Sequence, residues 1–142
     1  RELKQISSVP GLDAQLFFER VVFNFLIGNG DAHLKNYSIF YCNENEARLT
    51  PAYDIVSSQL VIPGEEDSAL TINGKKNKLS DKDFQDLAQY LNIPQKIRYE
   101  KFDRKLNVMS EIIRNSKCDK EKQAGFMDII KERFQRMGLQ VG

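Results

Sequence analysis

The sequence predicts a mostly α-helical domain, a helical bundle with a small β-hairpin beside a polar loop. Apolar residues recur near the helical period in several segments, as expected for helices with one buried face. After the polar loop, a segment rich in β-branched and aromatic residues alternates between apolar and polar positions, and an Asn-rich turn separates it from a second such segment. No internal repeat or second domain boundary is visible, which predicts a single domain over residues 1–142.

Helical periodicity and capping residues define the expected helices. Asp13 is the expected N-cap of the first helix. Ser80, with Asp83 three residues later, is an acidic variant of the capping box and predicts a helix start. Gly138 is the expected stop of the last helix. The expected helices are Gly11–Ile27, one that begins at Ser80 and buries Leu91, one from Pro94 to roughly Asn115, and one from about Lys120 to Met137.

Two short strands are expected directly after the polar loop. They cover Tyr37–Cys42 and Ala47–Thr50. A strand–turn–strand unit would return the chain to the loop that precedes it and bring Asp54 near that loop, although two separate loops remain the alternative. Residues 57–68 are rich in Ser, Pro, Gly and acidic residues and predict a mostly exposed connection, and residues 69–72 predict a short extended piece.

Composition excludes several classes of protein. The 142 residues include 21 Lys+Arg and 20 Asp+Glu, so a net charge of +1 favours neither nucleic acid nor an acidic membrane surface as a partner. No apolar run approaches the roughly 18 residues that a membrane-spanning helix needs. The two cysteines, Cys42 and Cys118, match no metal-binding or redox spacing. We therefore expect a cytoplasmic protein that makes no membrane contact and whose residues here bind no nucleic acid directly.

The most informative stretch is Gly28–Asn36, which reads Gly-Asn-Gly-Asp-Ala-His-Leu-Lys-Asn. It places Asp31 and Asn36 five residues apart, and Asp54 follows Asn36 by eighteen. In phosphoryl transfer, one carboxylate orients the attacking hydroxyl, while an amide oxygen and a second carboxylate hold Mg²⁺ on the phosphates of ATP. The spacing predicts Asp31 as the catalytic carboxylate, and Asn36 and Asp54 as the metal ligands and cofactor-binding residues.

Each polar residue of this stretch also has a plainer interpretation. An aspartate such as Asp31 in a Gly-rich turn more often caps the turn. The presence of the two expected metal ligands at kinase spacing makes the catalytic interpretation the preferred one. His33, the only histidine, either donates to a phosphate oxygen or braces the loop. Lys35 either offsets phosphate charge or is solvated. Asn29 is expected to hold the loop backbone rather than to touch substrate. The basic run Gly74–Lys78 either binds an acidic partner or forms a solvated turn.

Three ordered pieces of the chain carry a family resemblance. They are Ile27–Ser38, Leu49–Val56 and Ala69–Lys76, the last followed by Asp83-Phe84. At these residues the chain resembles the HipA family, bacterial serine/threonine kinases that act as toxins in toxin–antitoxin pairs. The resemblance implies a kinase-like C-lobe in which Asp31 aligns with the catalytic aspartate. It also implies a DNA-binding helix-turn-helix antitoxin as partner, and a protein substrate such as an aminoacyl-tRNA synthetase.

The sequence departs from kinase patterns in two ways. Asp54 is followed by Ile55 and Val56, where eukaryotic protein kinases have Phe and Gly. No Gly-rich phosphate loop or strand lysine precedes Asp31, and the chain opens at Arg1 without methionine. We therefore expect residues 1–142 to be the C-terminal catalytic lobe cut from a longer kinase and inactive alone. The alternatives are a small-molecule phosphotransferase of the aminoglycoside- or phosphoinositide-kinase type, or a docking module that is inactive without a separate N-lobe.

Overall fold

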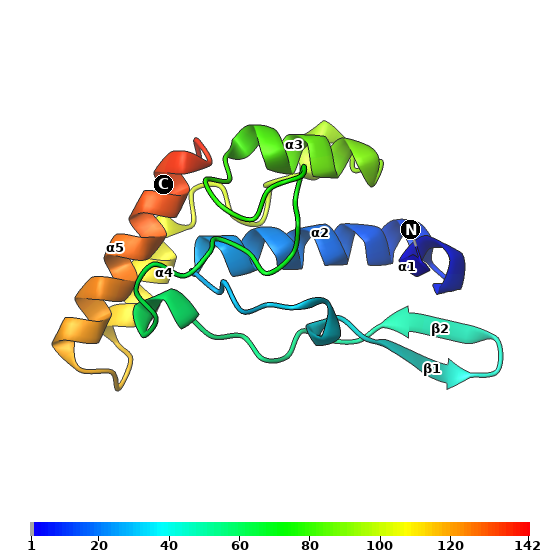
Figure 1. The fold of residues 1–142 in the computed structure, drawn as a ribbon, viewed down its shortest axis with the longest axis horizontal. Helices are drawn as coiled ribbons and strands as arrows, with labels where there is room; N and C mark the ends of the chain where they lie inside the picture. Colours follow the sequence, from blue (N-terminus) through cyan, green and yellow to red (C-terminus); the bar gives the residue numbers. More distant parts are fainter. Residues whose placement is uncertain (1) are drawn as a thin grey trace.

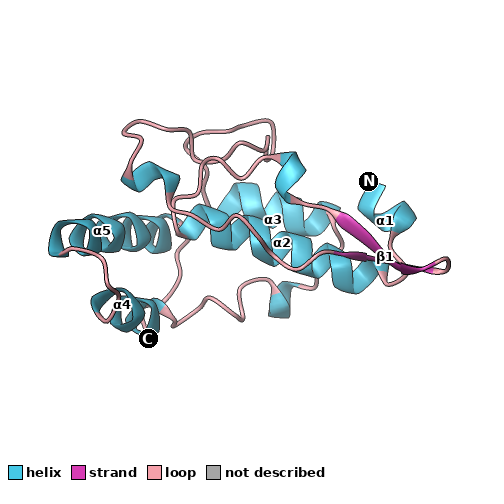
Figure 2. Ribbon diagram, turned by 90° about the horizontal axis from the view of Figure 1, so that it is seen from below, coloured by secondary structure: helices cyan, strands magenta, loops and turns pink. Residues whose placement is uncertain are grey.

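Helix α2 runs through the middle of the molecule, and the other elements pack around it (Figure 1). The computed structural model describes residues 2–142. Helix α3 lies along one side of α2, the β-hairpin lies on the opposite side, and α4 and α5 cover the end of α2 away from the N-terminus (Figures 1 and 2). In chain order the elements are α1 (Glu2–Ile6), α2 (Pro10–Leu26), the 3₁₀ turn η1 (Leu34–Asn36), β1 (Ile39–Asn43), β2 (Glu46–Leu49), η2 (Ser58–Leu60), α3 (Asp81–Tyr90), η3 (Gln95–Ile97), α4 (Leu106–Arg114) and α5 (Lys120–Arg136).

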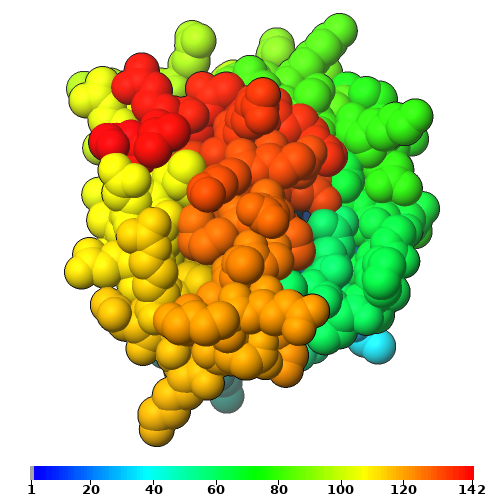
Figure 3. All heavy atoms as spheres, turned by 90° about the vertical axis from the view of Figure 1, so that its left-hand side faces the viewer, coloured from blue at the N-terminus to red at the C-terminus, as the bar shows by residue number. Residues whose placement is uncertain are grey.

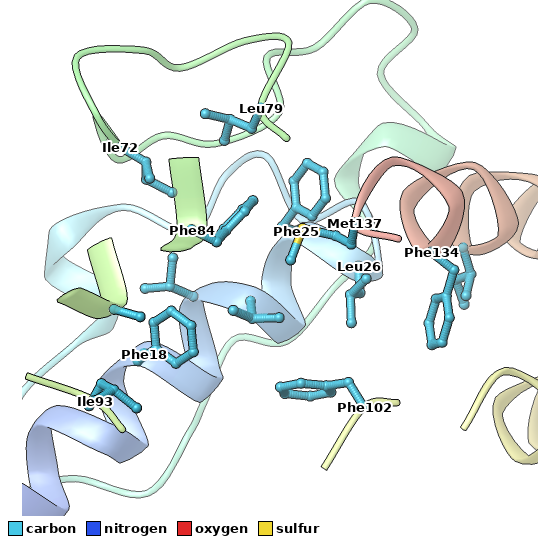
Figure 4. Close-up of a cluster of buried hydrophobic side chains, with 14 of the residues drawn as sticks. Phe18, Phe25, Leu26, Ile72, Leu79, Phe84, Ile93, Phe102, Phe134 and Met137 are labelled. Atoms are coloured by element: carbon cyan, nitrogen blue, oxygen red, sulfur yellow. The ribbon is translucent and has the colours of Figure 1, made fainter. Parts of the chain in front are cut away.

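The core forms where α2, α3 and α5 meet (Figure 4). Phe18 and Phe25 of α2 and Phe84 of α3 are almost completely buried, and the rings of Phe25 and Phe84 lie 4.9 Å apart between centroids. Their spacing along α2 puts both phenylalanines on one helix face. Burying each such side chain stabilises the fold by roughly 1.5–3 kcal/mol. The mostly helical fold class with one small hairpin is confirmed.

The hairpin is antiparallel, with Ile39 opposite Leu49 and Tyr41 opposite Ala47. The alternation along β2 turns Ala47 and Leu49 towards the protein, while Tyr41 on β1 is 69% exposed. A register irregularity falls between Tyr41 and Asn43, near the turn. The two expected strands are therefore present, and the polar loop and Asp54 lie at the base of the hairpin as the strand–turn–strand interpretation requires.

The helix predicted from Pro94 to Asn115 is wrong. The structure has the short turn η3, then irregular chain, and α4 begins only at Leu106. Arg104 adopts a φ of 59°, which no right-handed helix accommodates. Its backbone N–H and its Nε donate to the backbone O and Oε1 of Gln140, at 3.0 and 2.9 Å. Phe102 is buried and packs against Phe23, so tertiary contacts override the local helical pattern.

The assignment of Asp13 as an N-cap is also wrong, because α2 begins three residues earlier at Pro10. Asp13 is fully buried and acts as an anchor for the hairpin. It pairs with Arg48 at 3.0 Å and accepts hydrogen bonds from the backbone N–H of Leu49 and from Ser7 Oγ. Burial raises the pKa of Asp13, but these hydrogen bonds outweigh burial and hold it below its usual value.

The connection over residues 57–68 is less exposed than predicted. Ser58 and Asp67 are buried, and η2 forms between the two ends of the segment. The short helix α1 was not predicted, since five residues carry too little periodicity to be recognised. By contrast, Gly138 follows α5 with a φ of 65°, as expected for the stop of the last helix. Asp119, which is not among the expected caps, accepts from the backbone N–H of Lys122 at 2.8 Å and caps the start of α5.

Among residues 2–142, no helix combines the length and the apolar character needed to cross a membrane.

Candidate active site

The polar loop begins where α2 ends. Gly28 takes a φ of 69°, a left-handed conformation that turns the chain away from the helix axis. Asn29 is buried, its backbone N–H donates to Asn24 O at 2.8 Å, and its side-chain amide donates to Asn24 Oδ1 at 3.0 Å and to the backbone O of Asp54 at 3.3 Å. Asn29 therefore holds the loop backbone, as predicted, and also joins the loop to Asp54.

Asn36 and Asp54 lie in direct contact although their positions in the sequence differ by eighteen. Asn36 Nδ2 donates to Asp54 Oδ2 at 2.8 Å. Asn36 is the last residue of η1, and Asp54 follows the hairpin, so the strand–turn–strand unit brings the two together. Asp54 adopts a φ of 56°, which is uncommon for a residue other than glycine. Backbone strain of this kind clusters at functional sites and persists where surrounding contacts enforce it.

Tyr53 links the two segments that carry Asn36 and Asp54. Its hydroxyl donates to the backbone O of Lys35 at 2.8 Å and lies 2.6 Å from Ser38 Oγ. The residue directly before Asp54 is thus tied to the residue directly before Asn36. Sequence reasoning missed this role of Tyr53, although its place beside Asp54 in a family-like piece was a signal.

Asp31 and His33 form a second pair on the same loop. His33 Nε2 lies 2.8 Å from Asp31 Oδ1, and both side chains are more than half exposed. The backbone continues from this pair to the first one, because Asn36 N donates to His33 O at 2.9 Å. The structure therefore gives two contacting pairs, Asp31 with His33 and Asn36 with Asp54, joined by one short loop. The bracing interpretation of His33 fits this contact.

Lys35 is exposed and makes no ion pair among the residues that the structure describes. The basic run Gly74–Lys78 is an exposed turn, as the solvated-turn interpretation predicts, but one of its lysines also pairs within the protein. Lys75 Nζ lies 2.9 Å from Oδ1 of the buried Asp83, and Asn73 donates to the same oxygen at 3.0 Å. Burial alone would raise the pKa of Asp83, but bonds from Lys75, Asn73 and Ser80 lower it to about 2. The run is anchored on α3.

The donor set at Asn36 and Asp54 suits a hard divalent cation. Asn36 Oδ1 is buried and has no hydrogen-bond donor among the described residues, a costly arrangement for an amide oxygen. Turning the amide over would bring Oδ1 to Asp54 Oδ2, and two oxygens in contact repel each other unless a cation lies between them. Mg²⁺ prefers such oxygen ligands and shares them with phosphates. Within residues 2–142, no three His, Cys, Asp or Glu side chains cluster as a self-contained metal site.

Comparison with protein families decides the relationship of this chain. The family described as the HipA-like C-terminal domain matches residues 1–116, which is most of the chain. The chain belongs to the HipA-like C-terminal domain family. Helix α5, from Lys120 to Arg136, lies beyond the matched residues.

Similar proteins carry kinase names. The chain is 45% identical over 64 residues to "Putative kinase Y4dM" of Sinorhizobium fredii, which is 45% of this chain and 16% of that protein. It is 36% identical over 56 residues to "Putative kinase Y4mE" of the same organism, covering 39% and 13%. A protein of Haemophilus influenzae named "Putative kinase" is 42% identical over 40 residues, covering 28% and 12%. The chain thus covers about one sixth or less of these relatives, and the names support a kinase-related function for a HipA-like domain.

Proposed function

We propose that this chain is the catalytic lobe of a HipA-type serine/threonine protein kinase, which transfers the γ-phosphoryl group of ATP to a protein hydroxyl. One observation carries the proposal: Asn36 and Asp54 meet at 2.8 Å beside the loop that bears Asp31. The sequence alone left open whether Asn36 and Asp54 lie together or in two separate loops. Their contact, together with the family match over residues 1–116, supports one shared site.

Asp31 orients the acceptor hydroxyl and accepts its proton as the bond to phosphorus forms. The contact of Oδ1 with His33 holds the carboxylate in place and leaves Oδ2 to receive that proton. Asn36 and Asp54 would hold Mg²⁺, and Lys35 would add positive charge at the rim of the site. When bound, Mg²⁺ neutralises charge on the phosphate oxygens of ATP. Positioning of the reactants by these residues would supply most of the rate acceleration. The transition state is loose, so the protein takes part in little covalent chemistry.

The biological setting of the proposal comes from the family. We place the complete protein in the cytoplasm as the toxin of a toxin–antitoxin pair, bound by a helix-turn-helix antitoxin. Its substrate would be a component of translation such as an aminoacyl-tRNA synthetase. The residues described here would bind neither membrane nor nucleic acid. The Gly-rich loop and the strand lysine that hold the nucleotide phosphates would lie outside this lobe. The lobe alone would therefore transfer no phosphoryl group.

Replacement of Asp31 tests the proposal. In the complete protein, Asp31→Ala should lower the phosphoryl-transfer rate by about 10²- to 10⁴-fold, the usual range for loss of a positioned acid or base. Asp128→Ala, on the exposed face of α5, is the matched control and should leave the rate unchanged. A rate in Asp31→Ala equal to that of the control would refute the assignment. Acceptors should be tested side by side, because transfer to a sugar or lipid but to no protein would favour the small-molecule phosphotransferase.

A further inference from the structure

Helix α5 places a buried arginine beside the loop that carries the candidate active site. Arg133 is 3% exposed and lies in the last turn of α5. Figure 3 shows α5, in orange, lying directly against the green segment that follows the active-site residues. Because α5 lies beyond residue 116, the family match gives this helix no role.

Arg133 contacts three separate parts of the chain. Its Nη1 lies 2.6 Å from Asp67 Oδ1, and its Nη2 donates to Gln59 Oε1 at 2.6 Å. Its guanidinium carbon lies 4.5 Å from the centre of the Phe25 ring, on the last turn of α2. A buried cation is tolerated only with such partners. We call Arg133, Gln59, Asp67 and Phe25 the Arg133 cluster.

The Arg133 cluster touches the active-site loop at Gly28. The backbone N–H of Gln59 donates to Gly28 O at 3.0 Å, and Gly28 N donates to Phe25 O at 3.1 Å. A Cβ at Gly28 would lie 2.8 Å from Ile129 of α5 and 3.3 Å from Gln59 Oε1, so the two segments fit closely. Gly28 is therefore held by two members of the cluster, three residues before Asp31.

The contact extends along the loop through the segment after Gln59. Gln59 Nε2 donates to the backbone oxygens of Glu65 and Glu66, both at 3.4 Å. A Cβ at Gly30 would lie only 2.3 Å from that Glu66 oxygen. The same glutamine thus holds the wall against which Gly30 packs, directly before Asp31.

We propose that Arg133 is a positioning residue, which fixes the place of Asp31 by holding Gln59 against Gly28 and the Glu65–Glu66 wall. The proposal rests on the proposed function, since it concerns the same loop. The metal ligands are joined by a separate contact, because Tyr53, directly before Asp54, donates to the backbone O of Lys35, directly before Asn36. Loss of Arg133 therefore displaces the catalytic carboxylate and leaves nucleotide binding nearly intact.

The decisive variants are Arg133→Gln and Arg136→Gln in the complete protein. Arg136 is the matched control, because it also pairs with Asp67, at 2.6 Å, and lies 5.5 Å from the Phe25 ring, but no hydrogen bond joins it to Gln59 within residues 2–142. Arg133→Gln leaves Asp67 paired with Arg136. It should lower kcat by about 10- to 100-fold, the effect of roughly 1 Å of misplacement, while KM for ATP stays within about twofold. Arg136→Gln should keep kcat within about threefold.

Gln59→Leu provides a second route that leaves the buried ion pair of Arg133 and Asp67 in place. It should reproduce the kcat loss, and the double variant with Arg133→Gln should be no slower than the slower single variant, since both break one connection. Equal losses in Arg133→Gln and Arg136→Gln, or an unchanged kcat in Arg133→Gln, would overturn the proposal.

Hydrogen exchange separates this proposal from the proposed function. The backbone amide of Gly28 donates to Phe25 O, and its exchange should accelerate in Arg133→Gln and Gln59→Leu but not in Arg136→Gln. If the unsubstituted protein transferred no phosphoryl group, the kinase assignment would fail, whereas this exchange pattern would still support the positioning role. Unchanged exchange in both variants would overturn the positioning role on its own.

Discussion

Adding one methyl group at Gly30 should displace the loop that carries Asp31. A Cβ built at Gly30 lies 2.3 Å from the backbone oxygen of Glu66 and 2.7 Å from Glu65 Oε2. The glutamate side chain can swing away, but the carbonyl belongs to the backbone. The two segments must therefore separate by roughly 1 Å to reach an ordinary contact of 3.4 Å. Overpacking of this kind destabilises by about 1–3 kcal/mol, and a shift of that size lowers the catalytic rate by about 10²-fold.

The assay compares Gly30→Ala with two other glycine variants, using kcat of the complete protein and the free energy of unfolding. Gly11→Ala has nothing within 4 Å of the added Cβ and lies near the start of α2, so stability should be equal or slightly higher and kcat unchanged. Gly138→Ala is equally open but has a φ of 65°, which costs about 1–2 kcal/mol without touching the loop. Full activity in Gly30→Ala, or an equal rate loss in Gly138→Ala, would refute the reasoning.

Two further predictions concern buried carboxylates. The pKa of Asp83 in the folded protein is about 2, below its ordinary 3.8, so its ionisation contributes about 2 kcal/mol of stability at pH 7 that disappears as the pH falls from roughly 4 through 2. The free energy of unfolding, measured in urea from pH 7 to pH 2, should depend less on pH in Asp83→Asn than in the exposed control Asp86→Asn. An equal pH dependence in the two variants would contradict the account. Asp13→Ala leaves Arg48 and the N–H of Leu49 without their acceptor and should lower the free energy of unfolding by about 3 kcal/mol; a loss below roughly 1 kcal/mol would show that Asp13 is no anchor.

Much of the fold follows from local pattern. The apolar stripe of α2, the capping box at Ser80 and the glycine at 138 are all short-range signals, and the structure has helices where they predict them. The segment from Pro94 shows where such signals fail. Its helical pattern is real, but Gln140, far along the chain, binds Arg104 and holds it in a left-handed conformation. Local periodicity does not predict contacts between residues so far apart in the sequence.

The candidate site likewise has residues that the sequence suggests and residues whose role only the structure shows. The residue types and spacing of Asp31, Asn36 and Asp54 suggested a chemistry, and the hairpin brings the last two into contact. The supporting residues carry no comparable signal in the sequence. Tyr53 acts through its hydroxyl on a backbone oxygen, and Arg133 lies about a hundred residues from the loop it supports. A charged residue with helical spacing is usually solvated, so only the structure distinguishes Arg133 from its exposed neighbours.

The central claim is that Asn36 and Asp54 form one cation site beside Asp31, and metal binding tests it most directly. Mn²⁺, which can replace Mg²⁺ and is visible by electron paramagnetic resonance, should be titrated into the complete protein with ATP. Asp54→Asn and Asn36→Leu should each weaken Mn²⁺ binding by at least about tenfold, whereas Asp31→Asn should change it little. Equal Mn²⁺ affinity in the unsubstituted protein and in both ligand variants would contradict the account.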